Sequence, residues 1–496
     1  RPDTPRTLLA AVTDANNDKA NIDADAKPHS HQLVAIDLAK AQTEATAALT
    51  VVELDKQKTS KGPAPSPYTM QLSANGHYFV ATLSAGKALL LLDPKTYAEM
   101  GRIPTGHDPR GIVQFGGRIW TYAWLSNELQ GHLEPAAPTN GKMPLTLDKP
   151  VVAVIGDDPT PPDVKAGQQM FNDAAFSKHG DFSCNNCHVD GITDGLVWDL
   201  LVDGSVNTLA FRNVGGTGPF LWGGQLPTLF DFSREVLKLV GATASGKQME
   251  QLTTYMQSVT APPNPYTAPG GRMTEAAKNG AKIFYGASGS GGASCGDCHS
   301  GPLYTNTDTV DGKTKGKKTD VPSLLGVYDT GPWGREAQWS TLKAMTDYAV
   351  EFTNATLNDK EKSDLLEFVR QLPGDRLYLT SAQPLSGSNY VWAETKVELT
   401  FSAVLADGQE GLLLFREKPD TGAPKAVPGT WTISGRYARF KADAKLKQET
   451  KYELRVATGL VGQLGEQLGG AITIHFATGS TPELDVSGTW KATLKQ

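Results

Sequence analysis

Apolar residues change their spacing along the chain in a way that predicts different kinds of structure. Between residues 31 and 155 they alternate with polar residues over short runs, and turns rich in Gly, Asn and Asp separate the runs. Alternation with a period of two places successive side chains on opposite faces of a β-strand. Strands are predicted at residues 32–37, 77–82, 88–93, 111–115 and 118–122.

The middle of the chain has the helical spacing of apolar residues and contains an internal repeat. A proline-rich linker at residues 157–163 precedes this part. Two thirteen-residue blocks, 217–229 and 330–342, both begin with Thr-Gly-Pro and align without a gap. A helical segment comes before and after each block, so the sequence predicts two helical domains of the same design.

The last part of the chain returns to alternating strands, whereas its first residues are polar. Strands are predicted at residues 396–401, 411–415, 436–440, 451–456 and 471–476. Five short strands with Gly and Pro turns favour a small β-sandwich. Residues 1–28 are rich in Asp, Asn and Ala and are predicted to form a disordered arm. Asp14, Asn16 and Asp18 have the spacing of a calcium loop, but Lys19 stands where that loop needs Gly.

Two pentapeptides carry the most specific chemistry: residues 184–188 (Cys-Asn-Asn-Cys-His) and residues 295–299 (Cys-Gly-Asp-Cys-His). C-x-x-C-H is the attachment motif of a c-type haem. Two thiols on one helical turn form thioethers to one porphyrin, and the following His then ligates its iron. The attachment residues are predicted to be Cys184, Cys187, Cys295 and Cys298, with His188 and His299 as iron ligands.

A single zinc site built from both Cys pairs is the alternative interpretation of these motifs. Such a site needs no His directly after each pair, and its two halves usually lie much closer than the 111 positions that separate Cys184 from Cys295. The two motifs therefore favour two haems. They use all four cysteines of the chain, so no cysteine is left for a disulfide.

Composition and charge limit the kinds of partner and the cellular location expected for a protein with these haems. The 496 residues carry a net charge of −6, which gives no sign of nucleic-acid binding. No apolar stretch approaches the ~20 residues of a membrane-spanning helix. The sequence begins at Arg1 without an apolar leader, as expected of a mature or trimmed chain. Because haem is normally attached covalently outside the cytoplasm, we expect a periplasmic, extracellular or cell-surface location.

The N-terminal strands show a recurring pattern of their own. Each repeat of the pattern contains, in this order, a surface Pro, a Gly-containing turn, two strands and the ending Ile/Leu-Asp-x-x-Thr. This pattern resembles the blades of a bacterial YVTN-type β-propeller. Residues 67–105 and 107–156 look like successive blades. Only about three blades fit, whereas closed propellers have about four or more. Either another chain completes the propeller, or these strands are an open remnant, or the sequence is truncated.

The surroundings of both haem motifs point to a family. The first motif lies in Phe-Ser-Cys-x-x-Cys-His-x-Asp-Gly-x-Thr-Asp-Gly-Leu-x-Trp-Asp at residues 182–199, and Phe-x-Trp-Gly-Gly follows at residues 220–224. Thr-Asp-Val-Pro-Ser-Leu-Leu-Gly-Val at residues 319–327 follows the second motif. Residues 157–374 thus resemble the dihaem cytochrome c peroxidase/MauG superfamily, in the subgroup fused behind a YVTN propeller. Residues 446–478 resemble the Ig-like domains of bacterial surface proteins.

These features predict a multidomain chain in which all-α tandem cytochrome c domains are flanked by an N-terminal partial β-propeller and a C-terminal Ig-like β-sandwich. The predicted parts are the arm (1–28), the propeller-like blades (29–156), the first and second cytochrome c domains (164–265 and 270–374), the sandwich (378–480) and a C-terminal extension (481–496).

The resemblance implies roles for several residues. In that family one haem transfers electrons, the other activates peroxide, and a Trp between them relays charge. Trp222 holds that position here, although a buried core Trp would look the same. The resemblance also implies a calcium ion between the two haem domains, held by Asn207 and by the backbone of residues 319–322.

The sequence departs from relatives that carry a distal Met on the electron-transfer haem. Gly334 and Arg335 occupy the positions of their Met-His pair in the second block, and Leu221 and Trp222 do so in the first. Neither block therefore offers a sixth iron ligand. A ligand from elsewhere would come from Met345, His179, Tyr304, Tyr348, His107 or His132.

An open iron position is where peroxide would bind, and its cleavage needs a distal acid or base and a charge donor. By alignment the nearest candidates are Arg335 and Glu336 at the second haem and Gln225 at the first. Arg335 is equally suited to pair with a haem propionate.

The function predicted from these features is that of a peroxidase-like dihaem oxidoreductase. Its partners would be peroxide and a redox protein: a small cytochrome, a copper protein or a protein substrate. The alternative is a non-catalytic electron carrier whose β domains dock other proteins. Adhesion through the β domains alone leaves the haems unexplained.

Overall fold

The computed structural model of the chain describes residues 7–15, 29–41, 43, 49–56, 62–138, 143–144, 149–155, 158, 160–200, 203–261, 264–268, 272–286, 294–300, 303–311, 318–372, 376–384, 391–463, 465–468 and 470–479. The chain forms two compact units. One holds Arg1–Val259 and Asn279–Arg370, and the other holds Thr260–Lys278 and Gln371–Gln496. Among the described residues, none of the helices has the length and apolar character that a membrane crossing requires.

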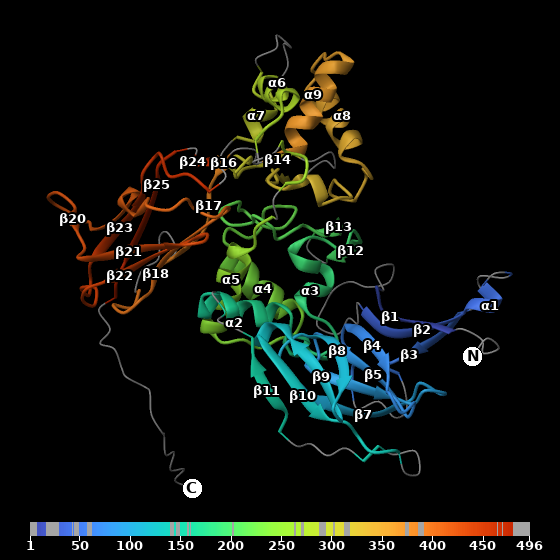
Figure 1. Cartoon of the computed structure of the whole chain (residues 1–496). Coiled ribbons are helices and arrows are strands. Elements are labelled where there is room, and N and C mark those ends of the chain that lie inside the picture. The colour runs from blue at the N-terminus through green and yellow to red at the C-terminus, as the bar shows by residue number, and fades with distance from the viewer. Residues whose placement is uncertain are drawn as a thin grey trace, which may run out of the picture. The chain divides into compact units, whose positions relative to one another are not determined.

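The first unit begins with antiparallel sheets (Figure 1). The first sheet contains β1 (Thr7–Ala15), β2 (His29–Asp37) and β3 (Leu49–Glu53). The second sheet contains β4 (Pro67–Leu72), β5 (Phe79–Leu83), β6 (Ala88–Leu92) and β7 (Glu99–Pro104). The third sheet contains β8 (Pro109–Phe115), β9 (Arg118–Ala123), β10 (Glu128–Leu133) and β11 (Val151–Val154). Short helical segments are α1 (Leu38–Ala41) and η2 (Trp124–Ser126).

The five strands predicted in this region correspond to β2, β5, β6, β8 and β9. The prediction of a disordered arm is wrong for β1, which pairs with β2 over its whole length. Residues 7–15 are mostly apolar, and the prediction for residues 1–28 as a whole followed the polar residues on either side of them. The second and third sheets have the strand order of a meander, and their resemblance to propeller blades stays a prediction.

These sheets pack face to face, and the second sheet is buried on both sides. Leu89 and Leu91 on one face lie in a cluster with Ile119 of the third sheet. Leu90, on the opposite face, lies in a cluster with Leu33 of the first sheet. Because alternate side chains of one strand reach different neighbours, the second sheet forms the middle layer of a stack.

The helices come in two sets with the same order, and all of them lie in the first unit except residues 275–278 at the start of α6, which belong to the second. The first set is α2 (Pro162–Phe171), η3 (Ala174–Phe176), α3 (Cys184–Cys187), η4 (Val189–Gly191), α4 (Leu229–Leu239) and α5 (Gly246–Ser258). The second set is α6 (Glu275–Phe284), α7 (Cys295–Cys298), η5 (Val327–Asp329), α8 (Leu342–Phe352) and α9 (Asp359–Arg370).

Equivalent contacts show that the two sets repeat one arrangement. A Cβ at Gly167 of α2 would lie 2.0 Å from the backbone oxygen of Gln251 in α5. A Cβ at Gly280 of α6 would lie 2.0 Å from the backbone oxygen of Asp364 in α9. In each half, therefore, the helix before the haem motif crosses the closing helix at a glycine, where only a hydrogen side chain fits.

The two thirteen-residue blocks also fold alike. An antiparallel bridge joins Phe220 to Leu226 in the first block and Trp333 to Trp339 in the second. Thr228 and Thr341 then cap α4 and α8, each accepting a backbone N–H bond from three residues later. The structural repeat predicted from the gapless alignment is present.

The prediction of an entirely α-helical middle part is wrong. A hairpin of β12 (Val197–Leu200) and β13 (Gly204–Asn207) follows the first haem motif, and β14 (Thr309–Asp311) and β15 (Lys318–Asp320) follow the second. Asp203 directly precedes β13 and Asp311 ends β14, and in the sequence each is followed by Gly. Asp-Gly between short strands is a strong hairpin signal.

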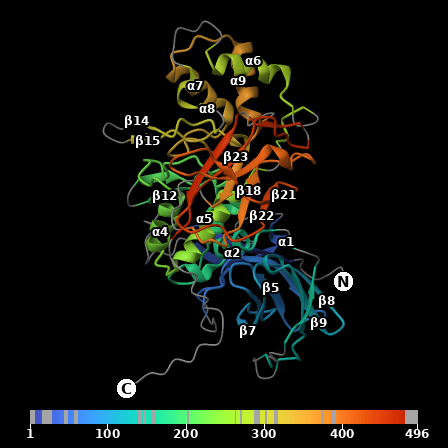
Figure 2. The same ribbon diagram turned by 90° about the vertical axis from the view of Figure 1, so that its left-hand side faces the viewer.

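The second unit is a β-sandwich, as the alternating pattern predicts (Figure 2). One sheet has the order β17-β18-β22-β21, the other β20-β19-β23-β25. The strands are β16 (Arg376–Leu377), β17 (Leu379–Gln383), β18 (Val397–Phe401), β19 (Leu413–Glu417), β20 (Lys425–Ala426), β21 (Gly429–Ser434), β22 (Tyr437–Ala442), β23 (Lys451–Val456), β24 (Gln467–Leu468) and β25 (Ile472–Ala477), with η6 (Glu410–Leu412).

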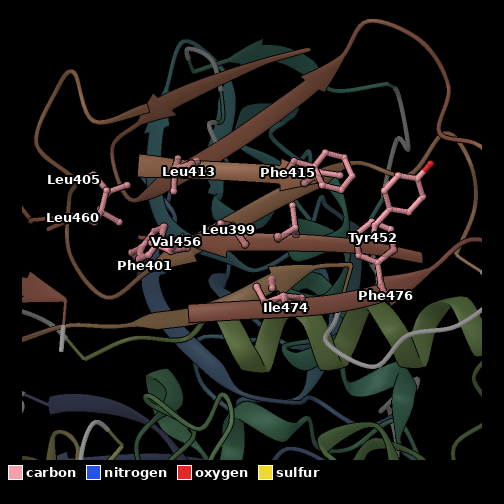
Figure 3. Close-up of a cluster of buried hydrophobic side chains, with 14 of the residues drawn as sticks. Leu399, Phe401, Leu405, Leu413, Phe415, Tyr452, Val456, Leu460, Ile474 and Phe476 are labelled. Carbon is pink, nitrogen blue, oxygen red and sulfur yellow. The ribbon is translucent and has the colours of Figure 1, made fainter. Parts of the chain in front are cut away.

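The core of this sandwich is aromatic and aliphatic (Figure 3). Phe401 of one sheet and Phe415, Tyr452 and Phe476 of the other are at most 4% exposed. Residues 260–278 belong to the same unit, where Gln371 donates to the hydroxyl of Thr274 at 3.0 Å. The predicted extension 481–496 lies outside the described residues.

Candidate haem-binding site

The first C-x-x-C-H motif forms one short helical turn that is ready to hold a porphyrin. Ser183 and Asn186 make a capping box around α3, which fixes Cys184 and Cys187 on the same turn. Burial raises the pKa of the Cys184 thiol to about 11 and that of Cys187 well above its ordinary value. Both thiols are free and therefore open to thioether formation.

His188 is oriented for iron ligation. Its Nδ1 lies 2.8 Å from the backbone oxygen of Leu209, and because a carbonyl only accepts, Nδ1 carries the proton. Nε2 is then left as the ligating nitrogen, the usual arrangement for a metal-bound His. Burial lowers the pKa of His188 to about 4, which keeps the ring neutral. Phe211 packs edge-on against the ring, with centroids 4.3 Å apart.

The second motif repeats this arrangement. Ser294 and Asp297 form the capping box of α7. The Nδ1 of His299 lies 3.1 Å from the backbone oxygen of Tyr304, and burial lowers the pKa of His299. Phe284 and Phe368, 5.0 Å apart, belong to the aromatic cluster of this half. The residues of both motifs thus fit a covalently held haem.

Trp222 lies where the two halves meet. It is 8% exposed, and its Nε1 donates to the backbone oxygen of Asn207 at 2.7 Å. Its own backbone oxygen accepts from the N–H of Asp320, in the second half, at 2.9 Å. Asn207 in turn donates from Nδ2 to the backbone oxygen of Pro332 at 2.6 Å. Trp222 is therefore bonded to both halves, through its side chain to the first and through its backbone oxygen to the second.

The predicted distal residues Arg335 and Gln225 meet at a residue that the sequence did not single out. Asp203, at the turn of the first hairpin, accepts on Oδ1 from Gln225 Nε2 at 2.6 Å and from Arg335 Nη2 at 3.1 Å. The Asp203 side chain is 2% exposed and that of Arg335 is 17% exposed. The Asp-Gly pair in the sequence could have indicated Asp203 as a turn residue. Its ion pair with Arg335 could not be predicted, because the pair forms only when the two halves pack together. Glu336 is exposed and lies outside these contacts.

Four buried polar atoms beside this cluster have no hydrogen-bond partner among the described residues: Asp203 Oδ2, Asn207 Oδ1, Asp320 Oδ1 and Arg335 Nη1. Burial raises the pKa of Asp320 to about 7. Groups of three or more His, Cys, Asp or Glu side chains suited to a metal do not occur in the described part of the chain. Calcium binding at Asn207, which the resemblance implies, stays a prediction.

The candidates for a sixth iron ligand are scattered. Met345 is half-buried on α8, Tyr348 stacks on Trp339 with centroids 4.5 Å apart, and Tyr304 is 1% exposed. Nε2 of His179 and Nε2 of His132 are buried without a partner among the described atoms. Burial lowers the pKa of both His107 and His132. Axial ligation by any of these residues stays a prediction.

The N-terminal sheets contact the first haem motif directly, which the sequence did not reveal. Asn186, inside the motif, donates to the hydroxyl of Ser66 at 2.9 Å. His31 is fully buried, and its Nε2 donates to the backbone oxygen of Asp181 at 2.5 Å. His29 packs between Phe182 and Trp198, and burial lowers its pKa to about 4. These β-strands therefore support the segment that carries Cys184.

Comparison with known proteins agrees with this geometry. Residues 161–266 match the family "Di-haem cytochrome c peroxidase". Residues 374–478 match the family "Bacterial Ig-like domain". These matches confirm the two resemblances inferred from the motifs and support a haem-dependent oxidoreductase.

The chain is also similar to individual proteins. It is 29% identical over 236 residues to hydrazine synthase subunit gamma of Kuenenia stuttgartiensis, a match that covers 40% of this chain and 63% of that protein. A structure of Kuenenia stuttgartiensis hydrazine synthase is 25% identical, with a TM-score of 0.36, over 43% of this chain and 89% of the other. A MauG-like protein associated with microbial copper homeostasis is 18% identical, with a TM-score of 0.34, over 44% of this chain and 91% of the other.

Proposed function

We propose that this chain is a dihaem c-type cytochrome of the peroxidase type, which accepts electrons from a redox protein and delivers them to peroxide. The observation that carries the proposal is the repeated motif geometry. Each half presents two free thiols on one capped turn and a neutral His whose Nδ1 donates to a backbone oxygen. Bound haem would supply the redox chemistry and the iron position at which peroxide is reduced.

In this proposal the protein holds one haem in each half, and the two halves are tandem cytochrome c domains. Cys184 and Cys187 would bind the first haem and Cys295 and Cys298 the second. In both His188 and His299 Nδ1 lies beside a backbone oxygen, so Nε2 is the nitrogen that would ligate the iron. Phe171 and Phe211 pack against His188, and burial keeps the imidazoles of both His188 and His299 neutral.

Trp222 is the proposed route for charge between the halves. Its indole N–H is bonded to the first half and its backbone oxygen to the second, so the ring is fixed at the junction. We expect a Trp222→Phe variant to retain both haems and to transfer electrons between them at least tenfold more slowly. Stopped-flow absorbance after reduction of one haem measures this rate. A Trp339→Phe variant, changed at a stacked Trp within the second block, is the matched control. An unchanged rate in Trp222→Phe would exclude the relay.

Arg335, Gln225 and Glu336 are the proposed distal residues. Asp203 already engages Arg335 through Nη2, while Nη1 is buried without a partner among the described atoms. Such a free donor favours a role for Arg335 in pairing with a haem propionate. Gln225 donates to the carboxylate of Asp203. Glu336 is exposed, so among the proposed distal residues it is the carboxyl that can exchange protons with solvent.

We also propose that a calcium ion binds beside Trp222, where Asn207 Oδ1 and Asp320 Oδ1 are buried without partners among the described atoms. The pKa of Asp320, raised by burial to about 7, is above its unfolded value. Its contribution to stability is therefore present in acid and is lost as the pH rises toward 7. Added calcium should compensate for this loss, so we expect it to raise the melting temperature at pH 8 but little at pH 5. In Asn207→Ala this gain should disappear; an equal gain at both pH values would contradict the site.

The location that fits this function is the periplasm or the cell surface, because haem is normally attached there and Ig-like domains occur in surface proteins. The electron donor would be a small cytochrome, a copper protein or a protein substrate. The second candidate function is a non-catalytic electron carrier, and the absence of a ligand from Leu221 and Gly334 argues against it.

Spectroscopy of the oxidised and half-reduced protein separates the two functions. The proposal predicts a high-spin ferric signal from at least one haem and a rapid spectral change on adding peroxide. Two low-spin haems that do not respond to peroxide in either state would establish the carrier.

A further inference from the structure

Tyr285, which directly follows α6, lies against the second haem motif. A Cβ added at Gly296, inside the motif, would lie 2.4 Å from Cδ1 and 2.9 Å from Cε1 of the Tyr285 ring. The edge of the ring therefore rests on the Gly296 backbone, where a hydrogen side chain leaves room for it. One peptide bond separates Gly296 from Cys295, whose thioether would join the porphyrin.

The same tyrosine also faces solvent. Tyr285 is 44% exposed, whereas the preceding Phe284 is 1% exposed and packs edge-on against Phe368 with centroids 5.0 Å apart. Successive residues of a helix point about 100° apart, so one of these two rings enters the core and the other leaves it. Residues 287–293, between Tyr285 and the motif in the sequence, are all Ala, Ser or Gly, so this segment has no large side chain.

The first half has a different pair of residues at these two positions. The repeat places Asn172 at the position of Tyr285, and it places Asn185 at that of Gly296. Asn172 is 9% exposed, and its Nδ2 donates to a backbone oxygen of α2 at 2.9 Å. Asn185 accepts the backbone N–H of Asp190 at 3.0 Å. The repeated fold therefore does not itself require a tyrosine on the haem-attachment turn, and the Tyr–Gly contact is a property of the second half.

The two motifs also differ in what lies over them. Asn186 of the first motif donates to Ser66 of the N-terminal sheets at 2.9 Å. The corresponding residue of the second motif, Asp297, is exposed and accepts the backbone N–H of Ser294 in its own turn at 2.9 Å. At this point the first motif is covered by another part of the chain, whereas the second motif is open to solvent.

We propose that Tyr285 is the surface residue through which the second haem takes up electrons, and that it does so as a tyrosyl radical. The inference rests on the proposed function, because peroxide is the oxidant that it needs. Peroxide accepts two electrons and two protons, its O–O bond breaks, and two molecules of water form. In each of two cycles the phenolic O–H bond of Tyr285 breaks. Tyr285 gives the electron to the oxidised second haem and the proton to water, and an electron from the redox protein with a proton from water restores it.

Without an electron donor the radical has a defined product. The exposed rings of Tyr285 from two molecules couple through a C–C bond between the carbons next to the phenolic oxygen, and the two ring hydrogens move to the oxygens. Two molecules of the protein and one of peroxide thus give one dityrosine-linked dimer and two molecules of water. This covalent product records the position of the radical.

The test adds hydrogen peroxide to the matured, haem-loaded full chain without a donor. Rapid-freeze EPR of wild type should show a tyrosyl radical, and peptide mapping should later find dimers joined at Tyr285. Tyr285→Phe should lose both, because Phe keeps the contact with Gly296 but has no hydroxyl, while its haems still respond to peroxide. Tyr266→Phe is the matched control and should behave as wild type, because Tyr266 is 45% exposed and belongs to the unit without haem motifs.

Fluorine NMR tests the contact without peroxide. Fluorotyrosine incorporated at position 285 should give a resonance that shifts or broadens between the reduced and the oxidised protein. This difference should disappear in Cys295→Ser/Cys298→Ser, which cannot attach the second haem.

Three results would count against the inference, and they are distinguishable. A radical and a dimer that persist in Tyr285→Phe, with haems that respond to peroxide, would overturn the role of Tyr285 alone. A fluorine resonance that is the same in both oxidation states would overturn the contact on which this role depends. A wild type whose haems do not respond to peroxide would overturn the inference together with the proposed function.

Discussion

A Gly280→Ala variant is expected to lose about 3 kcal/mol of unfolding free energy, the upper part of the usual range for overpacking a buried contact. The added Cβ would meet the Asp364 backbone oxygen at 2.0 Å and the Phe368 Cβ at 2.8 Å. Neither neighbour can rotate away, so α6 and α9 must separate. Urea unfolding followed by the haem absorbance of the second half measures the loss.

Two further glycines make this prediction specific. Gly167→Ala should destabilise the first half to a similar extent, because its Cβ would meet the Gln251 backbone oxygen at the same distance. Gly246→Ala is the control: Gly246 begins α5, and a Cβ added there would have no described atom of a neighbouring segment within 4 Å. Alanine there should be neutral or stabilise slightly through helix propensity. Equal stability of all three variants would show that the helices do not cross at these glycines.

An Asp203→Asn variant should be the most damaging change at the junction of the halves, with a loss of about 3 kcal/mol. Removing one member of a buried ion pair leaves the other charge without compensation, which costs about 3–5 kcal/mol, and the 17% exposure of Arg335 favours the lower value. The same change weakens the bond to Gln225, so the halves should also dock less firmly.

Guanidinium unfolding of Asp203→Asn measures the first effect, and slower electron transfer between the haems reports the second. The control is Asp347→Asn, which breaks a pair with Lys343 whose side chains are 40% and 69% exposed. Exposed pairs contribute about 1 kcal/mol or less. If both variants lost the same small amount, the Asp203 cluster would not hold the junction.

The parts of the molecule set by local sequence could be predicted. Both haem motifs, the repeated blocks and most strands follow from residue spacing, because a capped turn or an alternating strand depends on its own residues. Strand β1 was missed because the polar residues around it determined the prediction for residues 1–28, although residues 7–15 are themselves mostly apolar and pair with β2. The two hairpins were missed because three- and four-residue strands are short beside the surrounding helices, although an Asp-Gly pair occurs in the sequence of each.

The junction between the halves depends on distant contacts and was predicted less completely. Trp222 and Asn207 were identified by their positions in a resemblance, and the structure brings them within a hydrogen bond of each other. The side chains of Asp203 and Asp320 were given no role, although Asp320 lies in the segment 319–322 of that resemblance and Asp203 precedes a Gly in the sequence. They acquire their roles only when hairpins far apart in the sequence meet Arg335 and Trp222.

The central claim, two haems on four named cysteines, is tested most directly by the intact mass of the matured protein. The account predicts a mass two haems above that of the polypeptide, and a mass one haem above it for both Cys184→Ser/Cys187→Ser and Cys295→Ser/Cys298→Ser. Peptide mapping should place one haem on each motif. A denatured wild-type chain with the mass of the bare polypeptide, or a native chain that carries one zinc ion instead, would contradict the account.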